Sequence, residues 1–152
     1  MEWLSRRGHP VTGIDRSAQA ISTASNFGRG VLADIESGPW PLLHEGKPEV
    51  FAGVVVTNYL WRPLFKVMAQ SVAPGGVMIY ETFTRGNESV GKPSRPDFLL
   101  HPGELLNAFG DLQVVAYENG FLSGPERFVQ RLVAVRPAPP ADGPQAPVRY
   151  PL

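Results

Sequence analysis

Residues 51–60 read "FAGVVVTNYL", and this stretch decides the fold of the chain. Its β-branched run from Val54 to Thr57 predicts a strand that is buried on both faces, as central strands of parallel sheets are. The following segment, "RPLFKVMAQSV", places four apolar residues between Leu64 and Met68 at helical spacing, so it predicts a helix that returns across the sheet. "APGG" is expected to stop that helix and turn the chain into a second strand, "VMIYETF", which pairs parallel to the first.

Two shorter strands are expected before this unit. Residues 10–14 and residues 30–33 predict strands, with a helix between them. Ser17 is the expected N-cap of that helix, because its hydroxyl can accept a hydrogen bond from a free backbone N–H at the first turn. Gly28 is expected to close the helix. Strands that alternate with helices in this way predict an α/β protein with a mostly parallel sheet.

The last third of the chain changes character. "HPGELLNAF" predicts a brief helix with Pro102 in its first turn. "DLQVVAYENGFL" and "ERFVQRLVAVR" predict two strands joined by a turn too short for a parallel crossover, so they pair as an antiparallel hairpin. We therefore expect a folded domain over residues 1–136. The remainder, residues 137–152, is a proline-rich tail that we expect to be disordered.

Composition narrows the classes of function. The 152 residues carry 14 Lys and Arg against 14 Asp and Glu, so the excess positive charge of a nucleic-acid binder is absent and polynucleotide substrates are disfavoured. There is no cysteine, and no early apolar run is long enough for a signal peptide or a membrane span. We expect a soluble cytoplasmic protein that is not bound to a membrane. His9, His44 and His101 lack ligand spacing, so no metal site is expected and structural or exposed roles are favoured.

The ordered segments "VTGID", "LADIE", "VVVTNYLW" and "VAPGGVMIYETF", followed by a terminal hairpin, resemble class I S-adenosylmethionine-dependent methyltransferases. The longer stretch "YETFTRGNESVGKPSRPDFLLHPGELL" is similar to small bacterial methyltransferases of the tellurite-resistance type. The resemblance covers residues 1 to about 136. It implies a Rossmann-like three-layer sandwich, S-adenosyl-L-methionine as cofactor, and methyl transfer to a small molecule that the sequence does not identify.

Five residues are candidates for binding that cofactor. Asp15 ends the first strand, where open α/β sheets bind ligands, and its carboxylate can accept hydrogen bonds from both ribose hydroxyls. The resemblance implies that Asp34 contacts the adenine amine, that Ile35 packs on the adenine ring, and that the backbone of Thr57 and Asn58 faces the methionine part. The alternatives are a helix cap for Asp15 and an ordinary loop acid for Asp34.

Other candidates concern the acceptor and the chemistry. Tyr59 or Trp61 can present an aromatic face to a sulfonium, or either can simply belong to the core. Glu81 is a candidate general base or orienting group, and Arg85 and Arg95 are candidates for pairing an anionic substrate. The competing interpretation is a loop satisfied by its own salt bridges.

The segment "EWLSRRGHP" looks like the helix that follows a glycine-rich loop in the resembled methyltransferases, yet no strand and no GxGxG loop precede it. We therefore expect the first strand of the sheet to be missing from this chain, and we favour an upstream start of the gene product, with Met1 as an internal methionine. A fragment with weakened cofactor binding is the alternative. A non-catalytic binding module and a nicotinamide-dependent oxidoreductase, which also uses an acid after its second strand, remain competing functions.

Overall fold

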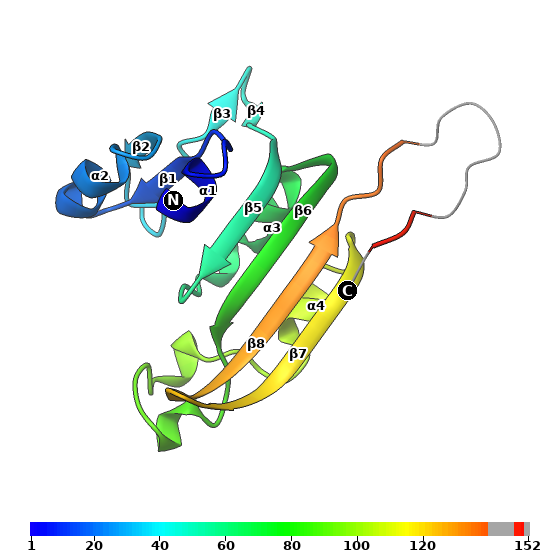
Figure 1. Ribbon diagram of the computed structural model, residues 1–152. Helices are drawn as coiled ribbons and strands as arrows, with labels where there is room; N and C mark the ends of the chain where they lie inside the picture. Colours follow the sequence, from blue (N-terminus) through cyan, green and yellow to red (C-terminus); the bar gives the residue numbers. More distant parts are fainter. Residues whose placement is uncertain (140–147, 151–152) are drawn as a thin grey trace. The chain divides into compact units, whose positions relative to one another are not determined.

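The computed structural model describes residues 1–139 and 148–150. The chain divides into two units, Met1–Lys47 and Pro48–Leu152, and each unit is described by itself (Figure 1). Residues 137–139 and 148–150 carry no helix or strand. The rest of the expected disordered tail, residues 140–147 and 151–152, lies outside the described residues.

The first unit contains a small parallel βαβ arrangement. After the short helix α1 (Glu2–Ser5), strand β1 (Thr12–Asp15) leads through α2 (Ala18–Ala24) to β2 (Arg29–Leu32), and β1 pairs with β2 in parallel. Ser17 caps α2 as predicted, because its side chain accepts a hydrogen bond from the backbone N–H of Ala20 at 3.3 Å. Both predicted strands and the intervening helix are therefore present.

Gly28 has a different role from the predicted one. Helix α2 is capped by Ser25 in a right-handed conformation, with φ −63°, so no glycine is needed to close it. A Cβ atom on Gly28 would lie 2.2 Å from the carbonyl oxygen of Val11. Gly28 instead allows the chain to approach Val11, whose carbonyl accepts a hydrogen bond from the Arg29 N–H at 2.9 Å.

A small hairpin follows at the junction of the two units. It consists of β3 (Leu43–His44) and β4 (Lys47–Pro48). Glu45 and Gly46 connect the two strands with φ values of 50° and 75°. Positive φ at both central residues is the geometry of the tight turns that match the twist of paired strands.

The second unit is a four-stranded mixed sheet. Its strands are β5 (Phe51–Thr57), β6 (Val72–Phe83), β7 (Gln113–Ser123) and β8 (Glu126–Val135), in the order β5-β6-β8-β7 (Figure 1). The connection from β5 to β6 runs through the 3₁₀ helix η1 (Arg62–Leu64) and α3 (Phe65–Gln70), and these two strands are parallel. Strand β8 pairs antiparallel with both β6 and β7, which confirms the predicted terminal hairpin.

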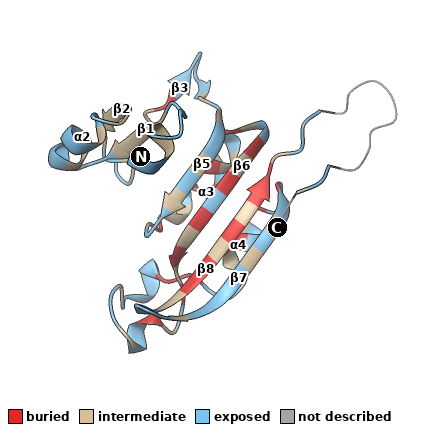
Figure 2. Cartoon of the chain, viewed as in Figure 1, coloured by how far each residue is buried: buried red, intermediate tan, exposed pale blue. Residues whose placement is uncertain are grey.

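The core of this unit lies between one face of the sheet and the helices. Residues on β6 and β8 alternate between buried and less buried positions, which Figure 2 shows as bands along both strands. Tyr80 on β6 is fully buried, and its ring lies 6.1 Å from that of Phe65 in α3 and 5.7 Å from that of Phe109, which caps α4 (Glu104–Ala108). Leu64 and Met68 are buried as well, so the predicted apolar face of the returning helix is confirmed.

Strand β5 is less buried than predicted. Val55 is 50% exposed, and Thr57 is exposed as well. The reason is topological, because β5 is an outer strand of its sheet and pairs only with β6 among the described residues. A β-branched run indicates a strand, but it does not show whether that strand lies at the centre or at the edge.

The "APGG" segment and Pro102 also differ from the predictions. Helix α3 ends at Gln70, and "APGG" lies within β6, where the pairing with β5 shifts between Phe51↔Val72 and Gly53↔Val77. Gly75 has φ 76°, and its N–H donates to the carbonyl oxygen of Arg136. The segment is therefore an irregularity inside a strand that pairs on both sides. Pro102 precedes the N-cap residue Gly103 and does not lie in the first turn of α4.

No helix in residues 1–139 or 148–150 is both long enough and apolar enough to cross a membrane.

Candidate functional site

In the first unit, two acidic residues stand at the carboxyl ends of neighbouring parallel strands. Asp15 is the last residue of β1 and pairs with Leu32, the last residue of β2, while Asp34 follows two residues later. This edge is where open α/β sheets bind ligands. The sheet of this unit therefore places Asp15 and Asp34 on one edge, as the sequence predicted from the two strand ends.

Asp15 uses one of its carboxylate oxygens locally. Oδ1 accepts a hydrogen bond from the backbone N–H of Ser17 at 2.7 Å, which orients the carboxylate at the start of α2. The helix cap itself is Ser17, so the alternative in which Asp15 is the cap describes only part of its role. In the described part of the chain, Oδ2 of Asp15 has no hydrogen bond, and an ionised carboxylate oxygen can accept two.

Asp34 closes a turn. Its Oδ1 accepts from the backbone N–H of Glu36 at 3.0 Å, and its Oδ2 accepts from the Ser37 hydroxyl at 2.8 Å. The hydrogen bond from the Ser37 side chain, followed by that from the Glu36 N–H, lowers the pKa of Asp34 below its ordinary value. Asp34 is thus ionised and fixed in direction, and the half-buried Ile35 follows it.

In the second unit, the carboxyl end of β5 carries Thr57 and Asn58. Thr57 pairs with Glu81 on β6, and the N–H of Asn58 donates to the Glu81 carbonyl at 2.9 Å. Asn58 has φ 53°, a left-handed conformation that asparagine adopts more readily than most residues. The chain therefore turns away from the sheet at Asn58 and leaves both residues exposed at the edge.

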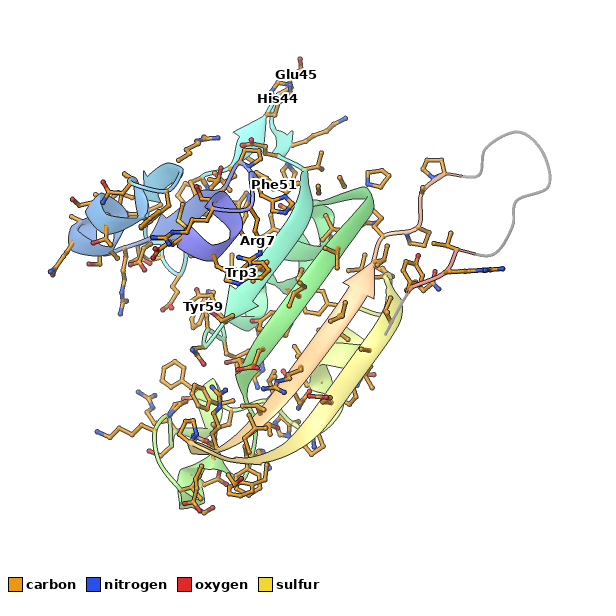
Figure 3. All side chains as sticks on the ribbon, in the orientation of Figure 1. Trp3, Arg7, His44, Glu45, Phe51 and Tyr59 are labelled. Carbon is orange, nitrogen blue, oxygen red and sulfur yellow. The ribbon has the colours of Figure 1, made fainter. Side chains whose placement is uncertain are left out.

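Tyr59 follows directly at the end of β5 (Figure 3). It is half-buried, and its carbonyl oxygen accepts a hydrogen bond from the hydroxyl of Tyr80 at 2.9 Å. Burial raises the pKa of Tyr80, so this hydroxyl stays protonated and keeps donating at any physiological pH. The backbone at Tyr59 is therefore anchored to the core, while the role of its ring, like that of the half-buried Trp61, stays a prediction.

Glu81 is held by two arginines. Its Oε2 accepts from Nε of Arg131 at 2.6 Å, and its Oε1 lies 3.3 Å from Nη1 of Arg127. Arg131 also contacts Oε2 of Glu118 on β7 at 3.0 Å, so a row of alternating charges crosses three strands. The carboxylates raise the pKa of Arg131, with the Glu81 hydrogen bond as the largest cause. Glu81 is therefore an ion-paired carboxylate, as in the salt-bridge interpretation, although its partners lie on β8.

The loop after β6 is fixed by buried polar side chains. Gln130 on β8 is fully buried, and its Nε2 donates to Oγ1 of Thr84 at 3.1 Å and to the carbonyl of His101. Asn87 is 1% exposed, and it donates to the carbonyl of Pro93 and accepts from the N–H of Phe128. A buried network with its groups satisfied makes a segment rigid. The loop that follows the carboxyl end of β6 is therefore held in a fixed conformation.

Arg62 and Glu104 form a further long-range ion pair in this unit. Nε and Nη2 of Arg62 contact the two oxygens of Glu104 at 2.6 and 3.0 Å, and further N–H groups of Arg62 donate to the carbonyls of Asp97 and Leu99. Burial raises the pKa of Glu104, but the hydrogen bonds from Arg62 and from the His101 N–H outweigh it and leave the pKa below its ordinary value. The pair joins η1 to α4.

The sequence interpretation missed these organising residues. The contacts of Gln130 and the pairing of Arg62 with Glu104 join residues 25 or more positions apart, so no local motif marks them. A partial signal existed for Gln130, because it occupies a position between Phe128 and Leu132 where the alternation of β8 calls for an apolar side chain.

Arg85 and His101 lie side by side on this loop. Nη2 of Arg85 is 3.3 Å from Nε2 of His101, and both side chains are exposed. In residues 1–139 and 148–150, no group of three or more His, Asp or Glu side chains is arranged to hold a metal ion.

A comparison with protein-family models finds no match for this sequence, and a comparison with curated proteins finds none either. Solved structures do resemble it. TehB from Haemophilus influenzae matches with a TM-score of 0.66 at 19% identity, over 88% of this chain and 52% of TehB. The [4+2]-cyclase SpnF matches with a TM-score of 0.65 at 11% identity, over 90% of this chain and 70% of the cyclase. An S-adenosylmethionine-dependent methyltransferase from Methanosarcina mazei matches with a TM-score of 0.65 at 13% identity, over 90% and 86% of the two chains.

These likenesses define the class of fold. The chain has the Rossmann-like fold of class I S-adenosylmethionine-dependent methyltransferases, with a parallel part and a closing antiparallel hairpin, as the resemblance implied. The chain spans about half the length of TehB.

Proposed function

We propose that this chain takes part in methyl transfer from S-adenosyl-L-methionine to a small molecule. The observation that carries the proposal is the position of its polar residues: in a chain with the methyltransferase fold, they follow the carboxyl ends of parallel strands in both units. Fold alone does not assign a reaction, as the cyclase SpnF illustrates by sharing this fold under a different activity. The site residues therefore have to support the assignment.

The residues of the first unit suit an adenosine group. Asp15 has a carboxylate oxygen without a hydrogen bond in the described residues, and a ribose hydroxyl is a suitable donor to it. Asp34 is an oriented carboxylate that can accept from an exocyclic amine, and Ile35 beside it offers an apolar surface for a ring. In the second unit, the exposed backbone at Thr57 and Asn58 is assigned to the methionine part.

The cofactor, when bound, supplies an electrophilic methyl group on a sulfonium. The work left to the chain is to align an acceptor, exclude water and hold charges in place, and it needs no strong base for that. We assign Glu81 to orienting the site and not to proton abstraction, because both of its oxygens already contact arginines. Tyr59 is the residue assigned to face the sulfonium, and Arg85 is assigned to the acceptor.

Calorimetric titration of the full chain with S-adenosylhomocysteine and, separately, with NAD tests the proposal. We expect S-adenosylhomocysteine to bind and NAD not to bind. Asp15→Ala should weaken that binding by about 1.5–3 kcal/mol, the range of hydrogen bonds to charged groups. Ser17→Asn is the matched control, because it keeps a capping side chain beside Asp15 and should leave the affinity unchanged.

Two outcomes would contradict the assignment. Tight binding of NAD alone would favour the oxidoreductase, and absence of binding at millimolar S-adenosylhomocysteine would favour a non-catalytic module. A screen of metabolites with cofactor labelled in the methyl group then identifies the acceptor. If no metabolite acquires the label, the result would count against methyl transfer.

A further inference from the structure

One arginine of the second unit differs from the others in its partners. Between Pro48 and Arg136 there are six arginines. Arg62, Arg95, Arg127 and Arg131 each form a salt bridge with a carboxylate, and Arg136 donates to the carbonyls of Val72 and Ala69. In the described residues, the side chain of Arg85 contacts only the ring nitrogen of His101. Its guanidinium therefore keeps most of its five N–H donors for another molecule.

The backbone fixes Arg85 and His101 next to each other. Leu100 forms a parallel bridge with Thr84, with its N–H donating to the Phe83 carbonyl and its carbonyl accepting from the Arg85 N–H, both at 3.0 Å. Thr84 and Leu100 are 2% and 0% exposed. Because successive side chains of extended backbone point to opposite faces, Arg85 and His101 project together from the exposed face.

A buried side chain keeps both residues in place. Gln130 is fully buried, and its Nε2 donates both to Oγ1 of Thr84 and to the carbonyl oxygen of His101. The same amide thus holds the residue before Arg85 and the backbone of His101 itself. The backbone that carries the two side chains is thus already ordered, so a ligand that binds them need not order this part of the chain, which favours affinity.

The chemistry of the pair selects an anion. A guanidinium can only donate, so in a hydrogen bond between the two side chains Nε2 of His101 accepts from Arg85. The guanidinium of Arg85 carries a positive charge and offers its remaining N–H groups to a ligand. Glu88 on the same loop, whose Oε2 accepts from the Gly86 N–H at 2.8 Å, adds a negative charge that disfavours dianions. A planar monoanion fits best, and the fork of an arginine matches a carboxylate in two-point contact.

The location of the pair connects it with the proposed reaction. Thr82 and Thr84 are buried, so Glu81 and Arg85 project from the same exposed face at the carboxyl end of β6. Thr57, which is assigned to the cofactor, pairs with Glu81 across β5 and β6. We propose that Arg85 and His101 bind a carboxylate group of the methyl acceptor, so that the substrate is a small organic acid. This inference rests on the proposed function, because only methyl transfer makes the bound acid the methyl acceptor.

Titration of the full chain with sodium acetate, followed by NMR signals of the His101 ring and the Arg85 side chain at constant ionic strength, tests the proposal. We expect a saturable shift at millimolar acetate, and none with acetamide, which has the same shape without the charge. Arg85→Gln should weaken acetate binding at least tenfold. Lys92→Gln is the matched control, because it removes one positive charge from an exposed position of the same loop, and it should leave the binding as in the parent chain.

Each other result has a defined meaning. Acetate shifts that persist in Arg85→Gln, shifts of equal size with acetamide, or no saturable shift at all would overturn the proposal. Tighter binding of inorganic phosphate than of acetate would replace the carboxylate with a phosphate as the recognised group and would also overturn it. A parallel titration with S-adenosylhomocysteine separates the two proposals, because Arg85→Gln should leave that affinity unchanged, and acetate binding is measured whether or not S-adenosylhomocysteine binds.

Discussion

The two units of the chain are stabilised in different ways. In the second unit, residues from β6, β8, α3 and α4 bury large side chains against one another, among them Tyr80, Met78 and Leu132. In residues 1–47, all of which the structure describes, Leu42 is the single buried apolar residue, and neither α1 nor α2 contains a buried residue. Burial of apolar surface therefore supports the second unit, whereas short-range hydrogen bonds support the first.

The contrast extends to the functional residues. Asp15 and Asp34 are oriented by the N–H groups of Ser17 and Glu36, two residues further along the chain in each case. Glu81 is positioned by its arginine partners on β8. Arg85 is positioned by the bridge between Thr84 and Leu100, which are 16 residues apart. Segments that lack a core open more easily, and a ligand that binds only the folded form stabilises it. We therefore expect the first unit to gain more protection from hydrogen exchange than the second when S-adenosylhomocysteine binds.

The strongest test of the comparison removes one aromatic ring from each unit. Phe109→Ala should destabilise the second unit by about 3–5 kcal/mol, because Phe109 is fully buried and its ring packs against those of Phe65 and Tyr80. Phe27→Ala in the first unit should lower stability by no more than about 1.5 kcal/mol, because Phe27 is only half-buried. Urea unfolding with peptide-resolved hydrogen exchange measures both. Equal effects would contradict the difference between the units.

The elements of this fold could largely be predicted from local patterns. The apolar spacing at Leu64 and Met68 gave α3, the hydroxyl of Ser17 gave the start of α2, and a turn too short for a crossover gave the antiparallel pairing of β7 and β8. Each of these signals acts within a few residues, so one sequence is enough to see it. Asp15 and Asp34 were proposed as candidates for a related reason, because Asp15 ends one strand and Asp34 comes after the next.

What could not be predicted depends on contacts distant in sequence. The sequence of β5 does not reveal that Val55 is exposed, because the exposure of a strand depends on which other strands flank it in the sheet. "APGG" contains strong turn residues, yet hydrogen bonds with Arg136, some 60 residues later, keep it in β6. His101 is exposed, as predicted from its lack of ligand spacing, but its contact with Arg85 could not be seen because the two residues lie 16 positions apart.

The ion pair between Arg62 and Glu104 offers a sharper test of long-range support, because its contribution to stability depends on pH. Folding lowers the pKa of Glu104, so its ionised form stabilises the fold above the ordinary glutamate pKa of about 4.3, and this contribution is lost as pH falls through the lowered value. Glu104→Gln should reduce stability at pH 7 by about 1 kcal/mol, a figure discounted for the 37% exposure of the Arg62 side chain. The difference from the parent chain should shrink as pH falls below about 4.

Urea unfolding of both proteins at pH 7 and at pH 3.5 checks this expectation. Glu88→Gln is a suitable control, because Glu88 is an exposed loop carboxylate with a local backbone partner. A penalty for Glu104→Gln that stays the same at both pH values would show that packing, and not the charge, makes Glu104 important.

The smallest expected effect concerns the cap of α2, and it tests whether short-range hydrogen bonds support the first unit. Ser17→Ala removes the acceptor for the Ala20 N–H and should destabilise α2 by about 1 kcal/mol, whereas Ser17→Asn keeps a capping oxygen and should cost little. Since α2 buries no side chain, nothing else in the helix compensates for the loss, and hydrogen exchange of residues 18–24 should quicken about fivefold in the alanine variant. Exchange in β6 and β8 should not change. If exchange in these strands quickened equally, the two units would be unfolding together. The distinction between a unit stabilised by a buried core and one stabilised by short-range hydrogen bonds would then be wrong.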